Sequence, residues 1–362
     1  IGRKQRLLLG HDHVHGDADQ QGRSKVPDLV ENGAQNRQTD GGSAVGDVAE
    51  QPSQGPSLFH DVGLCHWVSS WWLAQQTAIV LCPVVKPVGM RSEHGDVLAH
   101  VTSKVGPRHA LLIDPGKQDG ELAARRALVA VERGTRLILV GGSTDTPDNV
   151  VHATCTAIQD ALDLAAMAAS QNPEGDEGKW HVPVVLFPGG AHALSPAADG
   201  ILFMMLMNST DPRFLVSEQV RGAPYIAQFG IDTVPTGYLV MAPGGEVGRV
   251  GQADLVMPED VGRVKANALT AAMYGFRLLY LEAGSGADAP VNPALIRAAR
   301  DVEGLTLMVG GGLRDAASVQ HAVEAGADWV VTGTLIEETG DTSALTQALD
   351  DVLSGLRPQS SS

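Results

Sequence analysis

A carboxylate followed closely by two glycines is the first feature of this sequence that could do chemistry. In the run YLEAGSGADAP, residues 280–290, Glu282 lies near the end of an apolar stretch and residues 284–286 read Gly-Ser-Gly. A carboxylate at a strand end can accept a proton from a substrate hydroxyl, and Tyr280, on the same face of the strand, could orient that substrate. We therefore predict that Glu282 is a general base; the alternative is a structural ion pair with Arg314.

Small residues also follow the next two apolar runs. Gly311 and Gly312 follow one run, and Gly333 and Thr334 come at the end of the other. Backbone N–H groups freed by small residues can approach an anion closely, and β/α barrels often bind a phosphate after their last strands. Each pair alone could be a tight turn. Three such loops in succession, counting the one with Ser285, predict a single phosphate site.

A second set of polar residues follows the first two apolar runs. Asp114 ends one run, and Ser143 follows the glycine pair 141–142 after the other. A carboxylate and a hydroxyl at a shared opening suit Mg²⁺, which keeps several waters and takes oxygens from a substrate diphosphate. Asp114 could instead cap a helix, and Asp145 and Asp148 are better explained as caps of the next helix. Two anionic sites are thus predicted, for two phosphorylated substrates or one bisphosphate.

Eight short apolar runs must position these residues. Each is almost continuously apolar, as expected of parallel strands that are buried on both faces. The runs are 109–114, 135–140, 182–187, 200–206, 235–241, 278–283, 305–310 and 329–333. Helical patterns lie between most of them, at 120–134, 148–170, 257–275, 292–301 and 315–325. This alternation predicts an α/β fold, a closed TIM-type (β/α)8 barrel, with a doubly wound open sheet as the alternative.

The connection 188–199 departs from the pattern. It is short for a full crossover helix, so the helix there is vestigial or the barrel is modified. Four large apolar residues in or directly after the next run, 200–206, could form one wall of an apolar groove or simply pack in the core: Phe203, Met204, Met205 and Met207.

Composition limits the possible functions. The chain has 362 residues and is 43% hydrophobic but only 4% aromatic, so a sizeable core must be aliphatic. The net charge of −16 argues against a nucleic-acid partner, which would require basic patches. The three cysteines show no metal-ligand spacing and no disulfide pattern, which favours a reducing cytoplasm.

The chain divides into two unlike parts. Within residues 1–89, the stretches 11–25 and 31–57 are polar and without helix or strand period, which predicts that residues 1–89 are a disordered extension or sequence upstream of a true start at Met90. Residues 90–357 form the predicted barrel domain and 358–362 a disordered tail. The apolar segment 64–85 is interrupted by polar residues, so no transmembrane segment is predicted.

Several motifs together resemble the geranylgeranylglyceryl phosphate synthase family, which includes the heptaprenylglyceryl phosphate synthases. The stretch FPGG…ADGILFMMLMNS is similar to the second of the two groups in that family. The resemblance covers about residues 95 to 350. The motifs are LLIDPGK, VLFPGG, ADGILFMMLMNS, PTGYLVM, YLEAGSGA, VGGGLRD and GADWVVTGT.

This resemblance implies a barrel without its third helix. It implies transfer of a long prenyl chain, with geranylgeranyl expected, from its diphosphate to the 3-hydroxyl of sn-glycerol 1-phosphate, forming an ether and releasing diphosphate. It also implies a homo-oligomer, and the lipid product suggests weak membrane association. The alternatives are a barrel isomerase or aldolase acting on a sugar phosphate, and a non-catalytic phosphate-binding barrel.

The same resemblance implies roles for residues. Asp114 and Ser143 would hold Mg²⁺, and Glu282 would lie near the attacking hydroxyl with Tyr280 beside it. The residues implied in binding glycerol phosphate are Tyr280, Leu281, Glu282, Ala283, Gly284, Ser285, Gly286, Gly311, Gly312, Gly333 and Thr334.

Overall fold

The computed structural model of the chain describes residues 96–142 and 145–357. The predictions for residues 1–89 and 358–362, and for the apolar segment 64–85, lie outside the described residues. No helix of the described ranges is both long enough and apolar enough to cross a membrane.

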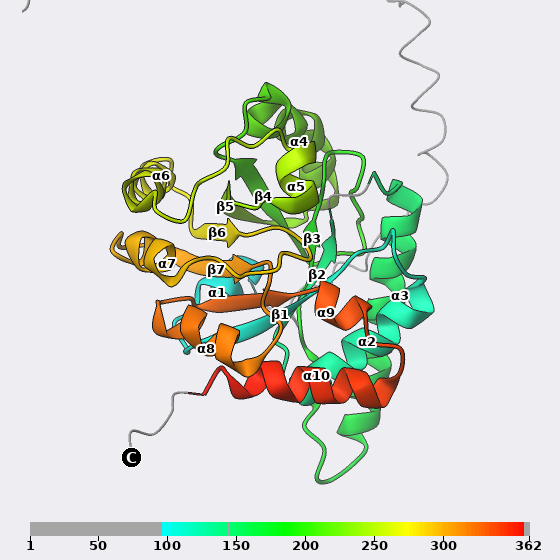
Figure 1. Cartoon of the computed structure of the whole chain (residues 1–362). Helices are drawn as coiled ribbons and strands as arrows, with labels where there is room; N and C mark the ends of the chain where they lie inside the picture. Colours follow the sequence, from blue (N-terminus) through cyan, green and yellow to red (C-terminus); the bar gives the residue numbers. More distant parts are fainter. Residues whose placement is uncertain (1–95, 143–144, 358–362) are drawn as a thin grey trace, which may run out of the picture. The chain divides into compact units, whose positions relative to one another are not determined.

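Eight parallel strands close into a barrel in the order of the sequence (Figure 1). The first strand pairs with the last, for example Ala110 with Val331, which closes the cylinder. The closed barrel is therefore confirmed over the open sheet. The strands are β1 (Arg108–Ile113), β2 (Leu137–Gly141), β3 (Val184–Phe187), β4 (Gly200–Leu206), β5 (Asp232–Val240), β6 (Leu278–Glu282), β7 (Thr306–Gly310) and β8 (Trp329–Thr332).

Helices surround the barrel, and the five helices expected from the sequence pattern are all found. In α2, Asp119 caps the first turn by accepting a hydrogen bond from the Leu122 backbone, and Gly134 ends the helix at a φ of 126°. The described helices are α1 (Val97–Thr102), α2 (Gly120–Arg133), α3 (Asp148–Ser170), α4 (Glu218–Phe229), α5 (Gly245–Val250), α6 (Val261–Met273), α7 (Pro293–Arg300), α8 (Ala316–Glu324), α9 (Thr334–Glu337) and α10 (Thr342–Ser354).

The connection between β3 and β4 contains no helix. Residues 188–199 run through turns directly from one strand to the next. The prediction that the third barrel helix is missing is confirmed, because twelve residues cannot turn back twice and also form a packed helix.

Apolar side chains alternate between the inside of the barrel and the layer under the helices. On β2, Leu139 lies in the inner cluster and Val140 in the outer one. The amino-terminal end of the barrel is covered by α1, where the Trp329 indole donates a 2.9 Å hydrogen bond to the carbonyl of Val101. The opposite end of the barrel, at the carboxyl ends of the strands, is therefore where a ligand-binding site is expected.

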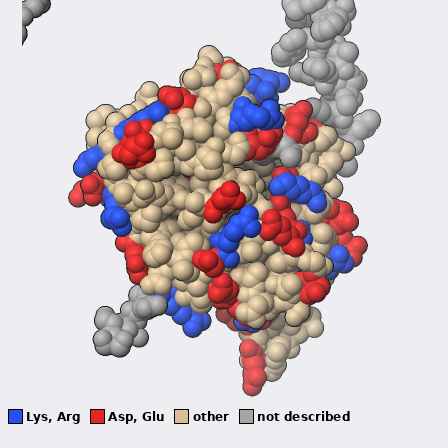
Figure 2. All heavy atoms as spheres, in the orientation of Figure 1, with Lys and Arg blue, Asp and Glu red and all other residues tan. Residues whose placement is uncertain are grey.

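Charged side chains of both signs share the visible face of the molecule. Figure 2 shows Lys and Arg scattered among Asp and Glu on that face, with uncharged surface between them. This face is electrostatically mixed, and its basic residues are not collected into a stripe.

Candidate active site

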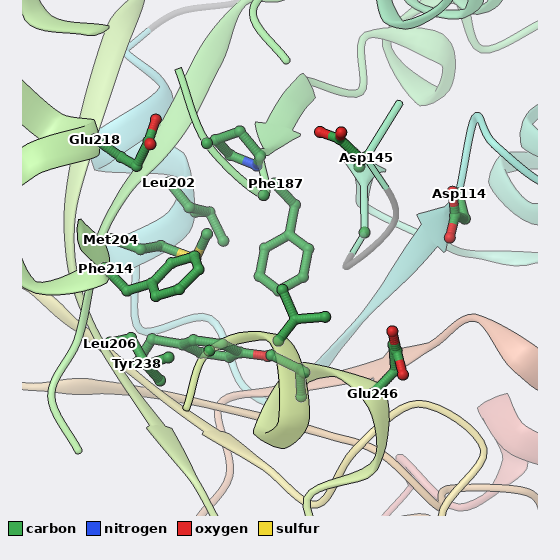
Figure 3. A pocket seen from close by; sticks show the side chains of 18 of the residues that line it. Asp114, Asp145, Phe187, Leu202, Met204, Leu206, Phe214, Glu218, Tyr238 and Glu246 are labelled. Atoms are coloured by element: carbon green, nitrogen blue, oxygen red, sulfur yellow. The ribbon is translucent and has the colours of Figure 1, made fainter. Parts of the chain in front are cut away.

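A cavity of about 720 Å³ opens at the carboxyl ends of the strands. Figure 3 shows that its two sides differ in chemistry. Apolar side chains such as Met204 and Phe214 gather on one side, and the carboxylates of Asp114 and Asp145 lie on the other. Such a cavity can hold a molecule with a long apolar tail and an ionic head.

The apolar side of the cavity depends on the missing helix. Met204 lies on the inner face of β4 and Phe203 on its outer face, yet both line the cavity. The outer face of β4 is accessible there because no helix follows β3. Met205 and Met207 do not line the cavity, and Met207 packs against the outer core. Two of the four residues proposed for the groove wall are therefore wall residues.

A smaller cavity of about 40 Å³ adjoins the last three strands. The loops after β6, β7 and β8 meet there, and the Ser285 hydroxyl lies 3.0 Å from that of Thr334. The structure thus brings the three glycine-containing loops to one place. The predicted glycerol phosphate residues that line this cavity are Tyr280, Glu282, Ser285, Gly286, Gly311, Gly312, Gly333 and Thr334.

The remaining predicted residues of the β6 segment lie differently. The side chains of Leu281 and Ala283 are fully buried in the outer core, facing the helices rather than the cavity. Gly284 contributes through its backbone, because its N–H donates a 2.6 Å hydrogen bond to Oε1 of Glu282. Only the alternate residues of the strand can therefore present side chains to a ligand.

Glu282 is a buried carboxyl group that lines both cavities. Burial raises its pKa from the ordinary 4.5 to about 7, although hydrogen bonds from the Gly284 N–H and the Tyr280 hydroxyl oppose the shift. Burial and the nearby charge of Glu282 raise the pKa of Tyr280 well above its usual range, so this phenol stays protonated. A carboxyl group that titrates near neutral pH suits general base catalysis.

Glycine is required opposite Glu282. A Cβ on Gly311 would overlap Oε1 of Glu282 and come within 2.8 Å of the Gly284 backbone, and Gly311 has a φ of +81°. The alternative role predicted for Glu282 is wrong, since Arg314 pairs with Glu338 at 3.2 Å. The Glu282 carboxyl group therefore faces the cavities rather than a structural cation.

Asp114 lies at the end of β1 and is only 5% exposed. Its Oδ1 accepts a 2.9 Å hydrogen bond from the Gly116 backbone, and its Oδ2 lies 3.9 Å from the Lys117 ammonium. A Cβ on Gly142 would come within 2.7 Å of Oδ2. Asp114 does not cap α2, whose cap is Asp119. Its carboxylate faces the large cavity instead.

Lys117 links the loop after β1 to α9, the short helix that follows β8. Its ammonium group is 2.8 Å from Oε2 of Glu337 on α9 and also approaches Asp114. Lys117 and Glu337 both line the large cavity. A cation is thus held beside the Asp114 carboxylate, where a phosphorylated head group would need one.

The other predicted metal ligand, Ser143, lies outside the described residues. Within residues 96–142 and 145–357, no three or more His, Cys, Asp or Glu side chains gather as a metal site. Asp145 is not a helix cap as predicted: it lines the cavity and its Oδ1 is 3.0 Å from Nε2 of His192. The α3 helix begins after Pro147, which offers no side-chain cap.

Two aromatic residues of the site were missed by the sequence analysis. Phe187 at the end of β3 and Tyr238 on β5 both line the large cavity. Tyr238 is paired in register with Tyr280 on the next strand. The available signal was that Tyr238 falls in the motif PTGYLVM, at a strand position with the same inward direction as Tyr280.

Comparison with known sequences finds one family and several similar enzymes. The PcrB family profile matches residues 102–354. The geranylgeranylglyceryl phosphate synthase of Methanothrix thermoacetophila is 43% identical over 237 residues, covering 65% of this chain and 86% of the relative. The synthase of the same name from Methanosarcina mazei is 40% identical over 248 residues, covering 68% and 93%.

Two solved structures are similar along most of their length. One is (S)-3-O-geranylgeranylglyceryl phosphate synthase from Thermoplasma acidophilum in complex with its substrate sn-glycerol-1-phosphate. It is 33% identical, with a TM-score of 0.63, and covers 72% of this chain and 96% of its own. The wild-type GGGPS from Thermoplasma volcanium is also 33% identical, with a TM-score of 0.64, covering 72% and 97%.

Proposed function

The chain belongs to the PcrB family, and we propose that it transfers a prenyl chain from a prenyl diphosphate to the 3-hydroxyl of sn-glycerol 1-phosphate. The observation that carries this proposal is the position of Glu282, which lines both the small polar cavity and the large, partly apolar one. A base at this junction lies between a phosphorylated polyol and the head of an isoprenoid. Relatives named geranylgeranylglyceryl phosphate synthase support the same activity.

The reaction forms one ether bond and breaks one phosphoester bond. The 3-hydroxyl oxygen bonds to C1 of the prenyl chain, and its proton passes to the Glu282 carboxylate. The bond between C1 and the diphosphate oxygen breaks, and its electron pair leaves with the diphosphate. Tyr280 holds the base in place through its hydroxyl, and the loop N–H groups around Gly311 and Gly312 bind the phosphate of the polyol.

We propose that the reaction uses Mg²⁺ and that Asp114 is the residue that would hold it. A single carboxylate at a cavity that receives a diphosphate fits this ion, which is often bound by one or two carboxylates together with substrate phosphates and waters. A Cβ at position 142 would come within 2.7 Å of Oδ2 of Asp114, so glycine at this position lets the carboxylate keep its place at the cavity. When bound, the ion would neutralise charge on the departing diphosphate. Lys117 supplies a second positive charge at the same place.

The large cavity argues against the rival activities. A sugar-phosphate isomerase or aldolase acts on a small polar substrate and does not need the apolar part of the large cavity. A non-catalytic phosphate-binding barrel has no use for a buried base whose pKa is raised to about 7. Prenyl diphosphate is therefore the proposed second substrate, with geranylgeranyl as the expected chain.

The proposal is tested by product formation with the full chain. The protein is incubated with labelled sn-glycerol 1-phosphate, Mg²⁺ and a series of prenyl diphosphates of increasing length, and the products are dephosphorylated and identified by mass spectrometry. An ether product with a long chain is expected, and sn-glycerol 3-phosphate serves as the stereochemical control. Absence of ether with every chain length contradicts the proposal.

Self-association is also proposed. One face of α6 carries large apolar side chains in contact with solvent, among them Leu269 at 42% and Met273 at 82% exposure. Covering such side chains is favourable, and a second copy of the chain is the proposed occupant. Light scattering coupled to size exclusion should give a mass above that of one chain, and Met273→Glu should lower it. A monomeric wild type at micromolar concentration contradicts this proposal.

Weak membrane association is proposed on separate grounds. Val216 and Val220 are 52% and 65% exposed. Val216 is two residues from the cavity-lining Phe214, and Val220 directly follows the cavity-lining Gln219. A product with a prenyl tail would leave by this side. Flotation with lipid vesicles should recover a fraction of the wild type and less of Val220→Asp; equal recovery of both contradicts the proposal.

A further inference from the structure

Aromatic rings are concentrated beneath the junction of the two cavities. The Phe187 and Tyr238 rings meet edge to face with centroids 5.6 Å apart. Tyr280 lies 5.5 Å from Phe187 and 5.1 Å from Tyr238. Only 4% of the chain is aromatic, so a three-ring cluster in one spot is not the ordinary filling of this aliphatic core.

The cluster lies where the character of the large cavity changes. Figure 3 shows Phe187 between the apolar side chains around Met204 and the carboxylate of Asp114. Phe187 and Tyr238 line the large cavity, Tyr280 lines the small one, and Glu282 lines both. In a prenyl diphosphate, the atom that joins the apolar tail to the ionic head is C1. A prenyl diphosphate whose tail lies along the apolar side chains and whose diphosphate lies near Asp114 therefore places C1 beside these rings.

The reaction makes this position electron-poor. As the bond from C1 to the diphosphate oxygen lengthens, the electron pair moves to the diphosphate, and positive charge spreads over the allylic carbons. The face of an aromatic ring carries negative electrostatic potential and attracts a cation, most strongly where water is excluded. Phe187 is 7% and Tyr238 5% exposed, so little water reaches the rings themselves.

We propose that Phe187 and Tyr238 are catalytic residues that stabilise the allylic cation character at C1 through their ring faces. This inference rests on the proposed prenyl transfer. It assigns to the rings a lowering of the activation barrier that neither Glu282 nor a metal at Asp114 supplies, because those groups act on the hydroxyl and on the leaving group. Interactions that are stronger in the transition state than in the ground state raise kcat without lowering KM.

A packing role for the rings predicts a different response to substitution. Fluorine atoms on Phe187 withdraw electron density from the ring face while changing its size very little, so packing is kept and cation binding is weakened stepwise. The full chain is prepared with phenylalanine, 4-fluoro-, 3,5-difluoro- and 3,4,5-trifluorophenylalanine at position 187. The chemical step is measured by rapid-quench single turnover.

A graded fall of about tenfold in the rate of the chemical step is expected across the series, with KM for the prenyl diphosphate nearly constant. The same series at Phe276, which is half-buried outside both cavities, is the matched control and should leave the rate unchanged. Equal rates across the Phe187 series, with normal melting temperatures, overturn the inference.

Tyr238 is tested with one variant that removes the aromatic ring and one that keeps the ring but removes the hydroxyl. Tyr238→Leu removes the ring and should lower the single-turnover rate about tenfold or more, whereas Tyr238→Phe should lower it less because a ring face remains. Equal losses in both variants would assign the effect to the hydroxyl and contradict the inference. A wild type that gives no ether with any donor refutes the prenyl transfer itself, whereas an active wild type with a flat fluorine series refutes only the role of the rings.

Discussion

Replacing Glu282 by glutamine tests the ionisation on which the reaction depends. Burial raises the pKa of this carboxyl group from 4.5 to about 7, which corresponds to about 3 kcal/mol, since each pKa unit is worth roughly 1.4 kcal/mol. The folded protein holds this proton more tightly than the unfolded chain does. Stability from this group is therefore complete below pH 4.5 and is lost progressively as the pH rises through about 7.

The variant Glu282→Gln cannot ionise and avoids that loss. Its amide oxygen can still accept the hydrogen bond from the Gly284 N–H. We expect the free energy of unfolding of the variant, relative to wild type, to increase by about 3 kcal/mol between pH 4.5 and pH 8. The measurement is urea unfolding at several pH values, followed by tryptophan fluorescence.

A sign control comes from Glu246, whose pKa is lowered by its hydrogen bond with Arg249. Glu246→Gln should lose stability relative to wild type as the pH rises toward 4.5 from below, the opposite trend to Glu282→Gln, and should then stay parallel to wild type above that pH. If wild type and Glu282→Gln show parallel stability curves between pH 4.5 and pH 8, the Glu282 carboxyl group ionises as it would in water. The electrostatic reasoning for this site is then refuted.

The same variant connects stability to catalysis. Glu282→Gln should lower kcat by about 10²- to 10⁴-fold, the usual contribution of a positioned general base. In the wild type, kcat/KM should rise with pH through about 7 as the carboxyl group of the free enzyme ionises. An active glutamine variant would remove Glu282 from the proton transfer.

Three further substitutions separate the parts of the site. Gly311→Ala should raise KM for sn-glycerol 1-phosphate more than KM for the prenyl diphosphate, because the added Cβ displaces Glu282 and the loop at Gly284; equal changes in both KM values contradict this. Asp114→Ala should weaken Mg²⁺-dependent binding of inorganic diphosphate, measured by calorimetry, at least tenfold; unchanged binding excludes Asp114 as the ligand. Gly222→Leu adds a side chain within the apolar part of the cavity and should shift donor preference to shorter chains; an unchanged preference places the tail elsewhere.

The strands and their order were predictable from the sequence alone. Apolar runs such as 278–281 are stable only when both faces of the strand are buried, which parallel strands inside a shell of helices provide. The short connection 188–199 likewise had no length for a helix. Local pattern and chain length decided these features. Eight such units favoured a closed barrel, and the pairing of β1 with β8 decided it over the open sheet.

The convergence of the anion-binding loops was also within reach of the sequence. Because the ends of parallel strands meet at one end of a barrel, residues as far apart as Ser285 and Thr334 could be assigned to one place. Strand alternation predicted that Tyr280 and Glu282 share a face, and both face inward. The inclusion of Leu281 and Ala283 ignored that alternation, and their side chains belong to the outer core.

Tertiary structure alone decided the chemistry of the environment. The pKa of Glu282 depends on its exclusion from water by residues from several strands, and no local pattern encodes that exclusion. Phe187 and Tyr238 come together from β3 and β5, the two strands that flank β4, although the residues are about fifty positions apart in the chain. The sequence determined which elements form and where they end, because those depend on neighbours along the chain; packing determined the cavities, the buried charge and the ring cluster, because those depend on neighbours in space.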